Sequence, residues 1–122
     1  MNTWNPYVAE CPSRRVLDRI ADKWSLLILA KLTGGPVRFN ELRRTIQGLS
    51  QKVLSQGLKN LERDGLVTRT AIATVPVTVE YAITPTGMRL AERAQDLINW
   101  ATDNMPAIIQ AQTTYDNRAL GR

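Results

Sequence analysis

Hydrophobic residues recur at helical spacing along most of the chain. Ser13 can cap a first helix, because a serine just before a periodic apolar stretch is a common N-cap. The next stretch, residues 25–32, is apolar nearly all round, which predicts a central buried helix. Gly34 and Gly35 are expected to end it. The apolar face of the first helix would consist of Val16, Leu17, Ile20 and Trp24.

Two further helices are predicted on either side of a break at Gly48. The first covers residues 39–46. The second is capped by Ser50, runs to Asp64 and is followed by Gly65, a favourable residue after a helix end. The apolar faces would be formed by Phe39, Leu42 and Ile46 in the first of these helices and by Leu54, Leu58 and Leu61 in the second.

Alternating and β-branched residues replace the helical pattern after Gly65. Residues 66–72 and 78–84 are the predicted strands of a β-hairpin, and residues 73–77 form its tip. The second strand alternates cleanly, so one of its faces is expected to be apolar. That face would carry Val79, Tyr81 and Ile83.

The last helix is predicted over about residues 85–109, with Thr84 as its N-cap and Pro85 at its first position. Pro106 must end or kink it near residues 104–105. Its apolar stripe has the spacing of a seam that packs against a partner helix, although packing within one chain is an alternative. The polar residues after position 109 are predicted to be frayed or weakly packed. The predicted dimerisation residues are Leu90, Ala94, Leu97, Ala101, Met105 and Ile108.

The chain has 122 residues, which predicts one domain over residues 1–122 with its core in residues 11–87. It contains no histidine and one cysteine, which excludes histidine-based catalysis, intrachain disulfides and cysteine-rich zinc sites. It has no glycine-rich phosphate loop. The only close acidic pair outside flexible regions, Glu62 and Asp64, does not face one site on a helix. We therefore expect no enzyme activity, no cofactor and no metal.

The longest apolar run, from Leu26 to Ala30, is far shorter than the ~20 residues of a membrane-spanning helix. Residues 1–6 lack a basic region followed by an apolar core, so no signal peptide is predicted. We expect a cytoplasmic protein with no membrane partner.

Positive charge is concentrated in the first half of the chain, and the formal net charge is +5. Residues 13–69 carry 12 lysines and arginines against 5 carboxylates, a balance of +7, and the remainder carries 4 against 6, a balance of −2. This distribution favours a polyanionic partner, although a basic surface that serves only solubility is an alternative.

The order of a helix, a tight turn, a polar-faced helix and a β-hairpin predicts a winged helix-turn-helix, an α+β fold that is mostly α. The helix that follows Ser50 would be the recognition helix. Short and medium polar side chains can reach base edges, and basic side chains suit phosphates. An ordinary solvated helix face is the alternative. The predicted DNA-binding residues are Arg38, Arg43, Arg44, Ser50, Gln51, Lys52, Ser55, Gln56, Lys59 and Arg69.

Several stretches of the chain match one family in the right order, namely 11–12, 22–29, 35–44, 48–54, 64–67, 79–81 and 84–87, with Leu58, Leu61 and Glu62 between them. Through them, roughly three quarters of the chain resembles the HxlR-type transcriptional regulators of bacteria, winged-helix proteins related to the MarR group. The resemblance implies a homodimeric repressor that binds inverted-repeat double-stranded DNA, with N- and C-terminal helices at the dimer interface. The chain departs from the family pattern at the wing tip, where Val77 and Thr78 stand in place of a usual second proline and basic residue, so wing contacts to DNA are expected to be weak.

Cys11 is a candidate redox sensor. It precedes the predicted helix start and lies close in sequence to Arg14 and Arg15, and both a helix N-terminus and guanidinium groups favour the thiolate. Several members of the family that this chain resembles use a cysteine at this position to sense oxidants or electrophiles. A small buried residue without a redox role is the alternative.

Two other functions stay open from the sequence. The first is regulation by a small ligand between subunits, near aromatic residues of the N- and C-terminal helices. The second is a winged helix that binds only proteins and never DNA, which negligible DNA affinity of an intact dimer would favour. The aromatic residues in the first alternative are Trp4, Tyr7, Trp24 and Trp100.

Overall fold

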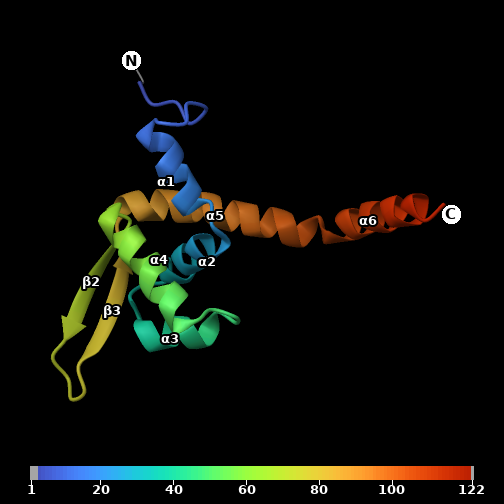
Figure 1. Ribbon diagram of the computed structural model, residues 1–122. Coiled ribbons are helices and arrows are strands. Elements are labelled where there is room, and N and C mark those ends of the chain that lie inside the picture. Colours follow the sequence, from blue (N-terminus) through green and yellow to red (C-terminus); the bar gives the residue numbers. More distant parts are fainter. Residues whose placement is uncertain (1–2, 122) are drawn as a thin grey trace.

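The computed structural model describes residues 3–121, so positions 1, 2 and 122 of the predicted single domain lie outside the described residues. The fold is mostly helical with a small antiparallel sheet, as predicted (Figure 1). The elements are α1 (Pro12–Ile20), α2 (Lys23–Leu32), β1 (Val37–Arg38), α3 (Phe39–Thr45), α4 (Gln51–Arg63), β2 (Val67–Ile72), β3 (Thr78–Ile83), α5 (Pro85–Asp103) and α6 (Met105–Ala119).

The sheet has the strand order β1-β3-β2, and both pairs of neighbours are antiparallel. The predicted hairpin is formed by β2 and β3, with Val67 opposite Ile83 and Arg69 opposite Tyr81. The two-residue strand β1 was not predicted. It pairs Val37 with Tyr81, and it fixes the start of α3 to the sheet.

The predicted start of α1 is wrong by two residues. Cys11, not Ser13, is the N-cap, and Pro12 occupies the first helical position, where its missing N–H is no loss. Trp24 belongs to α2, which begins after its own N-cap, Asp22. The apolar side chains Val16 and Leu17 of α1 are exposed.

The core lies between α2, α4, α5 and the inner face of the hairpin. As predicted, α2 is the central helix and α4 buries the apolar face inferred from its spacing. This packing buries the apolar side of α4 and leaves its other side exposed to solvent. The largest fully buried side chains are Ile28, Leu29, Leu32, Leu42, Leu54, Leu58, Leu61 and Val67.

Both ends of α4 are fixed by side chains. At its start, the Ser50 hydroxyl accepts a hydrogen bond from the Val53 N–H at 3.1 Å, which confirms the predicted cap. At its end, Gly65 adopts a φ of 77°. Arg19 of α1 pairs with the C-cap residue Asp64 through two N–H···O contacts of 3.0 and 2.7 Å. These contacts join the end of α4 to α1.

The long C-terminal segment breaks where Pro106 was predicted to break it, at Asn104. The tail is not frayed, because α6 continues to Ala119, but it is weakly packed as predicted, since no residue of α6 is buried. Pro106 lies in the first turn of α6, where proline is tolerated. Figure 1 shows α6 extending away from the rest of the chain, and none of its residues is buried.

Candidate nucleic-acid interface

One side of α4 is an exposed polar face. Its first two residues, Gln51 and Lys52, are exposed, and their side chains have no hydrogen-bond or ion-pair partner within residues 3–121. Gln56 is also exposed, but its amide already donates to Asn60 at 3.1 Å. The start of α4 therefore offers two unengaged polar side chains to a ligand.

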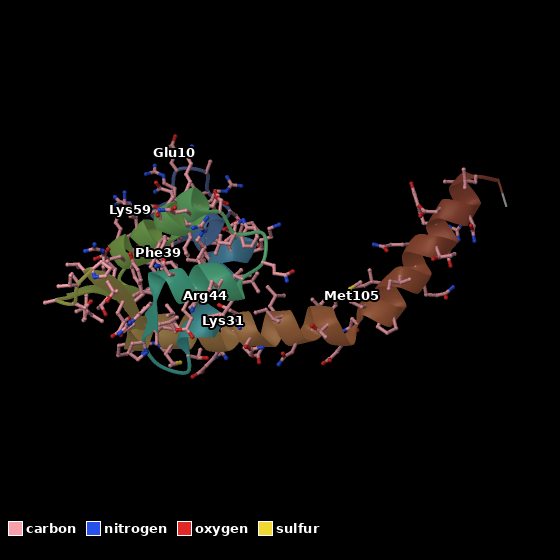
Figure 2. The ribbon with its side chains drawn as sticks, turned by 90° about the horizontal axis from the view of Figure 1, so that it is seen from below. Glu10, Lys31, Phe39, Arg44, Lys59 and Met105 are labelled. Carbon is pink, nitrogen blue, oxygen red and sulfur yellow. The ribbon has the colours of Figure 1, made fainter. Side chains whose placement is uncertain are left out.

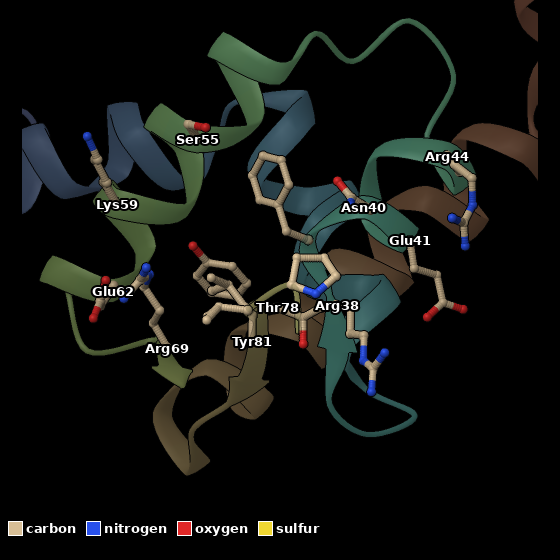
Figure 3. Close-up of a pocket in the computed structure, with 14 residues that line it drawn as sticks. Arg38, Asn40, Glu41, Arg44, Ser55, Lys59, Glu62, Arg69, Thr78 and Tyr81 are labelled. Carbon is tan, nitrogen blue, oxygen red and sulfur yellow. The ribbon is translucent and has the colours of Figure 1, made fainter. Parts of the chain in front are cut away.

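A concavity of about 1070 Å³ lies between α3, α4 and the hairpin (Figure 3). Half of the predicted DNA-binding residues line it, namely Arg38, Arg44, Ser55, Lys59 and Arg69. The other half lie outside this concavity, namely Arg43, Ser50, Gln51, Lys52 and Gln56. The predicted DNA-binding residues are thus divided between a basic hollow, the exposed side of α4 and Arg43 of α3.

Four cationic residues and two carboxylate residues, Glu41 and Glu62, contribute to the lining of the hollow. Arg69 lies on the same face of the hairpin as Tyr81, and Figure 3 shows it reaching toward Glu62 of α4. Arg38 is opposite Glu80, on the other face of the sheet from Tyr81. The excess of positive charge suits a phosphate backbone.

Sequence reasoning missed three residues of this surface. Asn40 and Thr78 line the hollow with polar side chains. Val53 on α4 is apolar yet 41% exposed, beside Lys52. The sequence carried a signal for Val53, because it lies off the buried face formed by Leu54 and Leu58.

The tip of the hairpin is apolar rather than basic. Val75 and Val77 are exposed, and the Thr74 hydroxyl donates to the Pro76 carbonyl at 2.8 Å. The tip therefore adds no cation to the surface, and Arg69 is the one basic side chain of β2, β3 and their connection.

The Cys11 thiol is half-buried and held by hydrogen bonds. Its sulfur lies 3.1 Å from the Ser13 hydroxyl and accepts from the Asn5 N–H at 3.2 Å. The Ser13 side chain and then the Asn5 backbone lower the pKa of Cys11. Arg14 and Arg15, which the sequence suggested as the cause, do not contribute to this shift.

Replacing Ser13 with alanine should therefore raise the pKa of Cys11 and slow its alkylation by iodoacetamide near neutral pH. The pH at which the alkylation rate is half-maximal reports the pKa, and it should move upward in Ser13→Ala. Arg14→Ala is the matched control, and its profile should stay in place. An unchanged profile in Ser13→Ala would contradict this explanation of the pKa shift.

The N-terminal segment and α1 enclose an apolar hollow of about 500 Å³. Of the four aromatic residues proposed for a ligand between subunits, Trp4 lines it, and Tyr7, Trp24 and Trp100 do not. The four aromatic residues therefore do not line this hollow together. Its lining is Trp4, Pro6, Pro12, Ser13, Val16, Leu17 and Ile20.

The predicted dimerisation stripe is divided in two. Ala94 is 1% exposed and so belongs to the interior of this chain, a correction to the prediction, and the half-buried Leu90 packs against the same core. Leu97 and Met105 are 53% and 41% exposed. Ala101 is exposed and Ile108 is half-buried. The outer four residues of the stripe stay candidates for a dimer contact.

Within residues 3–121, no helix is long and apolar enough to cross a membrane. The same part of the chain holds no group of three or more histidine, cysteine or acidic side chains that could bind a metal ion.

Helix, turn and exposed helix followed by a hairpin define a winged helix-turn-helix transcriptional regulator, which confirms the predicted fold class. The family model described as "HxlR-like helix-turn-helix" matches residues 19–109. The chain belongs to this family, as its sequence motifs indicated.

Three relatives illustrate the similarity. The uncharacterized HTH-type transcriptional regulator YtfH of Escherichia coli K12 is 41% identical over 115 residues, covering 94% of this chain and 89% of that protein. The structure of a transcriptional regulator ytfH from Salmonella typhimurium has a TM-score of 0.87 at 37% identity, covering 90% of this chain and 98% of that one. The oxidized form of the redox regulator HypR has a TM-score of 0.69 at 35% identity, covering 77% and 97%.

Proposed function

We propose that this protein is a homodimeric, sequence-specific DNA-binding repressor. The observation that carries the proposal is the exposed polar face of α4 beside a hollow with an excess of positive charge. A helix held by its apolar side and open on its polar side can enter the major groove. A dimer bound over an operator represses by excluding other proteins from that DNA.

The two parts of the surface have different roles in this proposal. Gln51 and Lys52 are exposed and unengaged at the start of α4, so they read base edges. The cations of the hollow, with Arg43 beside it on α3, bind phosphates and provide most of the affinity through release of counterions. Ser50 caps its own helix through its oxygen and can still donate its hydroxyl proton to a phosphate.

The dimer is supported by two apolar surfaces that this chain leaves uncovered. One is the hollow along α1, and the other is the outer stripe on α5 and α6, from Leu97 to Ile109. An isolated helix of the length of α6 is marginal in water, so a packing partner for it is expected. We propose a second copy of the chain as that partner, which pairs two α4 helices for an inverted repeat.

Oxidation of Cys11 is the proposed regulatory input. Its thiol pKa is lowered by hydrogen bonds, and HypR, a structural relative, is a redox regulator. Cys11 also caps α1, whose residues line the apolar hollow, so a modified sulfur would disturb that surface. With one cysteine in the chain, the reversible products are a sulfenic acid, a mixed disulfide or an intersubunit disulfide.

A pair of substitutions tests the division between base reading and phosphate binding. Gln51→Ala should reduce discrimination between operator and random DNA by about ten-fold, because a lost base contact affects only the correct sequence. Arg43→Ala should weaken binding to both DNAs alike and reduce the dependence on salt. The measurement is fluorescence anisotropy with the intergenic DNA beside the gene and with a scrambled duplex, at two salt concentrations.

An unchanged operator-to-random ratio in Gln51→Ala would contradict the base-reading role. Negligible DNA binding at low salt by an intact dimer would contradict the proposed function as a whole, and would favour a winged helix that binds proteins.

A further inference from the structure

A hollow of about 400 Å³ lies where α2, the end of α3 and α5 meet, away from the basic concavity. Figure 2 shows Lys31 beside α3 and α5 at this junction. Its apolar lining is buried or half-buried, whereas its polar lining is exposed and forms a rim. The apolar residues are Leu27, Ala30, Ile46 and Ile98, and the polar residues are Lys31, Thr45, Gln47 and Gln95.

Of the four polar side chains of the rim, two already donate hydrogen bonds within the chain and two do not. The Thr45 hydroxyl donates to the Glu41 carbonyl at 2.9 Å, and the Gln95 amide donates to Asn99 at 3.0 Å. Lys31 and Gln47 have no hydrogen-bond or ion-pair partner in the described part of the chain. Lys31 is the one charged residue of the lining, so the hollow carries a positive charge that no lining carboxylate neutralises.

We propose that this hollow binds a small monocarboxylic acid with an apolar body. The ammonium of Lys31 and the amide of Gln47 would hold the carboxylate, because charge-assisted hydrogen bonds to a carboxylate are the strongest that these side chains form. The apolar body would cover Leu27 and Ile98, which remain half-exposed in the free chain. A small volume with a mostly apolar lining and few polar groups is typical of small-molecule sites.

The position of the hollow gives such a ligand a regulatory effect on the proposed function, on which this part of the inference rests. Thr45 is the last residue of α3, and Gln47 belongs to the segment that leads from α3 into α4. Gln95 and Ile98 belong to α5, which leads to the proposed dimer contact. A ligand that touches both would couple the placement of α4 to that of the C-terminal helices.

Binding is tested with octanoate on the full chain, with octanol as the neutral analogue of equal length. Amide shifts in a ¹⁵N spectrum should change at residues 27–31, 45–47 and 95–98. Lys31→Met should weaken octanoate binding by about three- to ten-fold and leave octanol binding unchanged, because it removes only the exposed charge. Lys23→Met is the matched control on α2, since Lys23 lies over the Trp24 ring, 4.6 Å from its centroid, and outside the hollow.

Equal affinity for octanoate and octanol would overturn the carboxylate site, as would shifts confined to other residues or no binding at millimolar octanoate.

Coupling is tested by the anisotropy titration with and without saturating octanoate. The factor by which octanoate changes the DNA dissociation constant should equal the factor by which DNA changes the octanoate constant. A factor of one would overturn the regulatory part and leave the binding site standing. Octanoate binding without any DNA binding would contradict the proposed function alone, so the two failures are distinguishable.

Discussion

Replacing Gly87 with alanine is expected to lower the free energy of unfolding by about 3 kcal/mol. Gly87 is buried in the first turn of α5, where its N–H donates to the Thr84 hydroxyl at 3.0 Å. A Cβ at this position would collide with the backbone carbonyl of Leu66 and would lie 2.8 Å from Cγ1 of Ile83. The carbonyl cannot move freely, because it also accepts the Thr84 N–H at 3.0 Å.

The matched control is Gly57→Ala in α4. The nearest atom to a Cβ there would be Cδ1 of Ile28 at 3.6 Å, which is ordinary van der Waals contact. The alanine should therefore raise the free energy of unfolding by about 0.5–1 kcal/mol, as expected when a helical glycine is replaced without strain. Urea unfolding followed by circular dichroism measures both variants.

A lower free energy of unfolding in Gly87→Ala together with a higher one in Gly57→Ala would show that the steric requirement at Gly87 is distinct from the effect of helix propensity. If Gly87→Ala were as stable as the parent, the close contact between α5 and the Leu66 backbone would be absent in solution.

Local chemistry made much of the fold predictable. The caps at Ser50 and Thr84 and the break at Pro106 depend on residues within one helical turn, so they can be read from a few positions. The start of α1 was equally readable, because Pro12 at the first helical position identifies Cys11 as the cap. Ser13 misled because serine is the commoner cap residue.

The features that could not be predicted from the sequence depend on residues that are distant along the chain. Strand β1 is two residues long, and it exists because Val37 meets Tyr81, more than forty residues later. The basic hollow likewise joins Asn40 of α3 to Thr78 of β3. No local pattern marks either pairing, since each requires the hairpin to fold back onto α3.

The stripe on the last helix illustrates a limit of periodicity. Its spacing predicted an apolar face and could not say which chain covers each residue. Ala94 is covered by this chain, whereas Leu97, one turn later, is not. The helix α2 packs against α5 and still reaches Ile98, the residue after Leu97, so Leu97 is exposed because its side chain does not face α2. Which neighbour lies beside each side chain of the stripe is decided by the tertiary structure and not by the spacing.

Removal of α6 by a stop after Asn104 is expected to leave a folded monomer with about a hundred-fold weaker affinity for an inverted repeat. The fold should persist, because none of the described residues of α6 is buried. The affinity should fall because each recognition helix would then bind its half-site independently, and the gain from linking two sites is lost. Sedimentation equilibrium, circular dichroism and anisotropy measure mass, folding and affinity.

A point substitution separates the contact surface of α6 from its mere presence. Ile109→Asp places a charge on an apolar side chain that is 52% exposed, and it should dissociate the dimer as the truncation does. Thr114→Asp is the matched control, since Thr114 is exposed and lies about 140° round the helix from Ile109. A truncated chain that remained dimeric and bound the inverted repeat at full affinity would assign the dimer contact to other surfaces. In that case, the exposed stripe on α6 would have to be covered by a different partner.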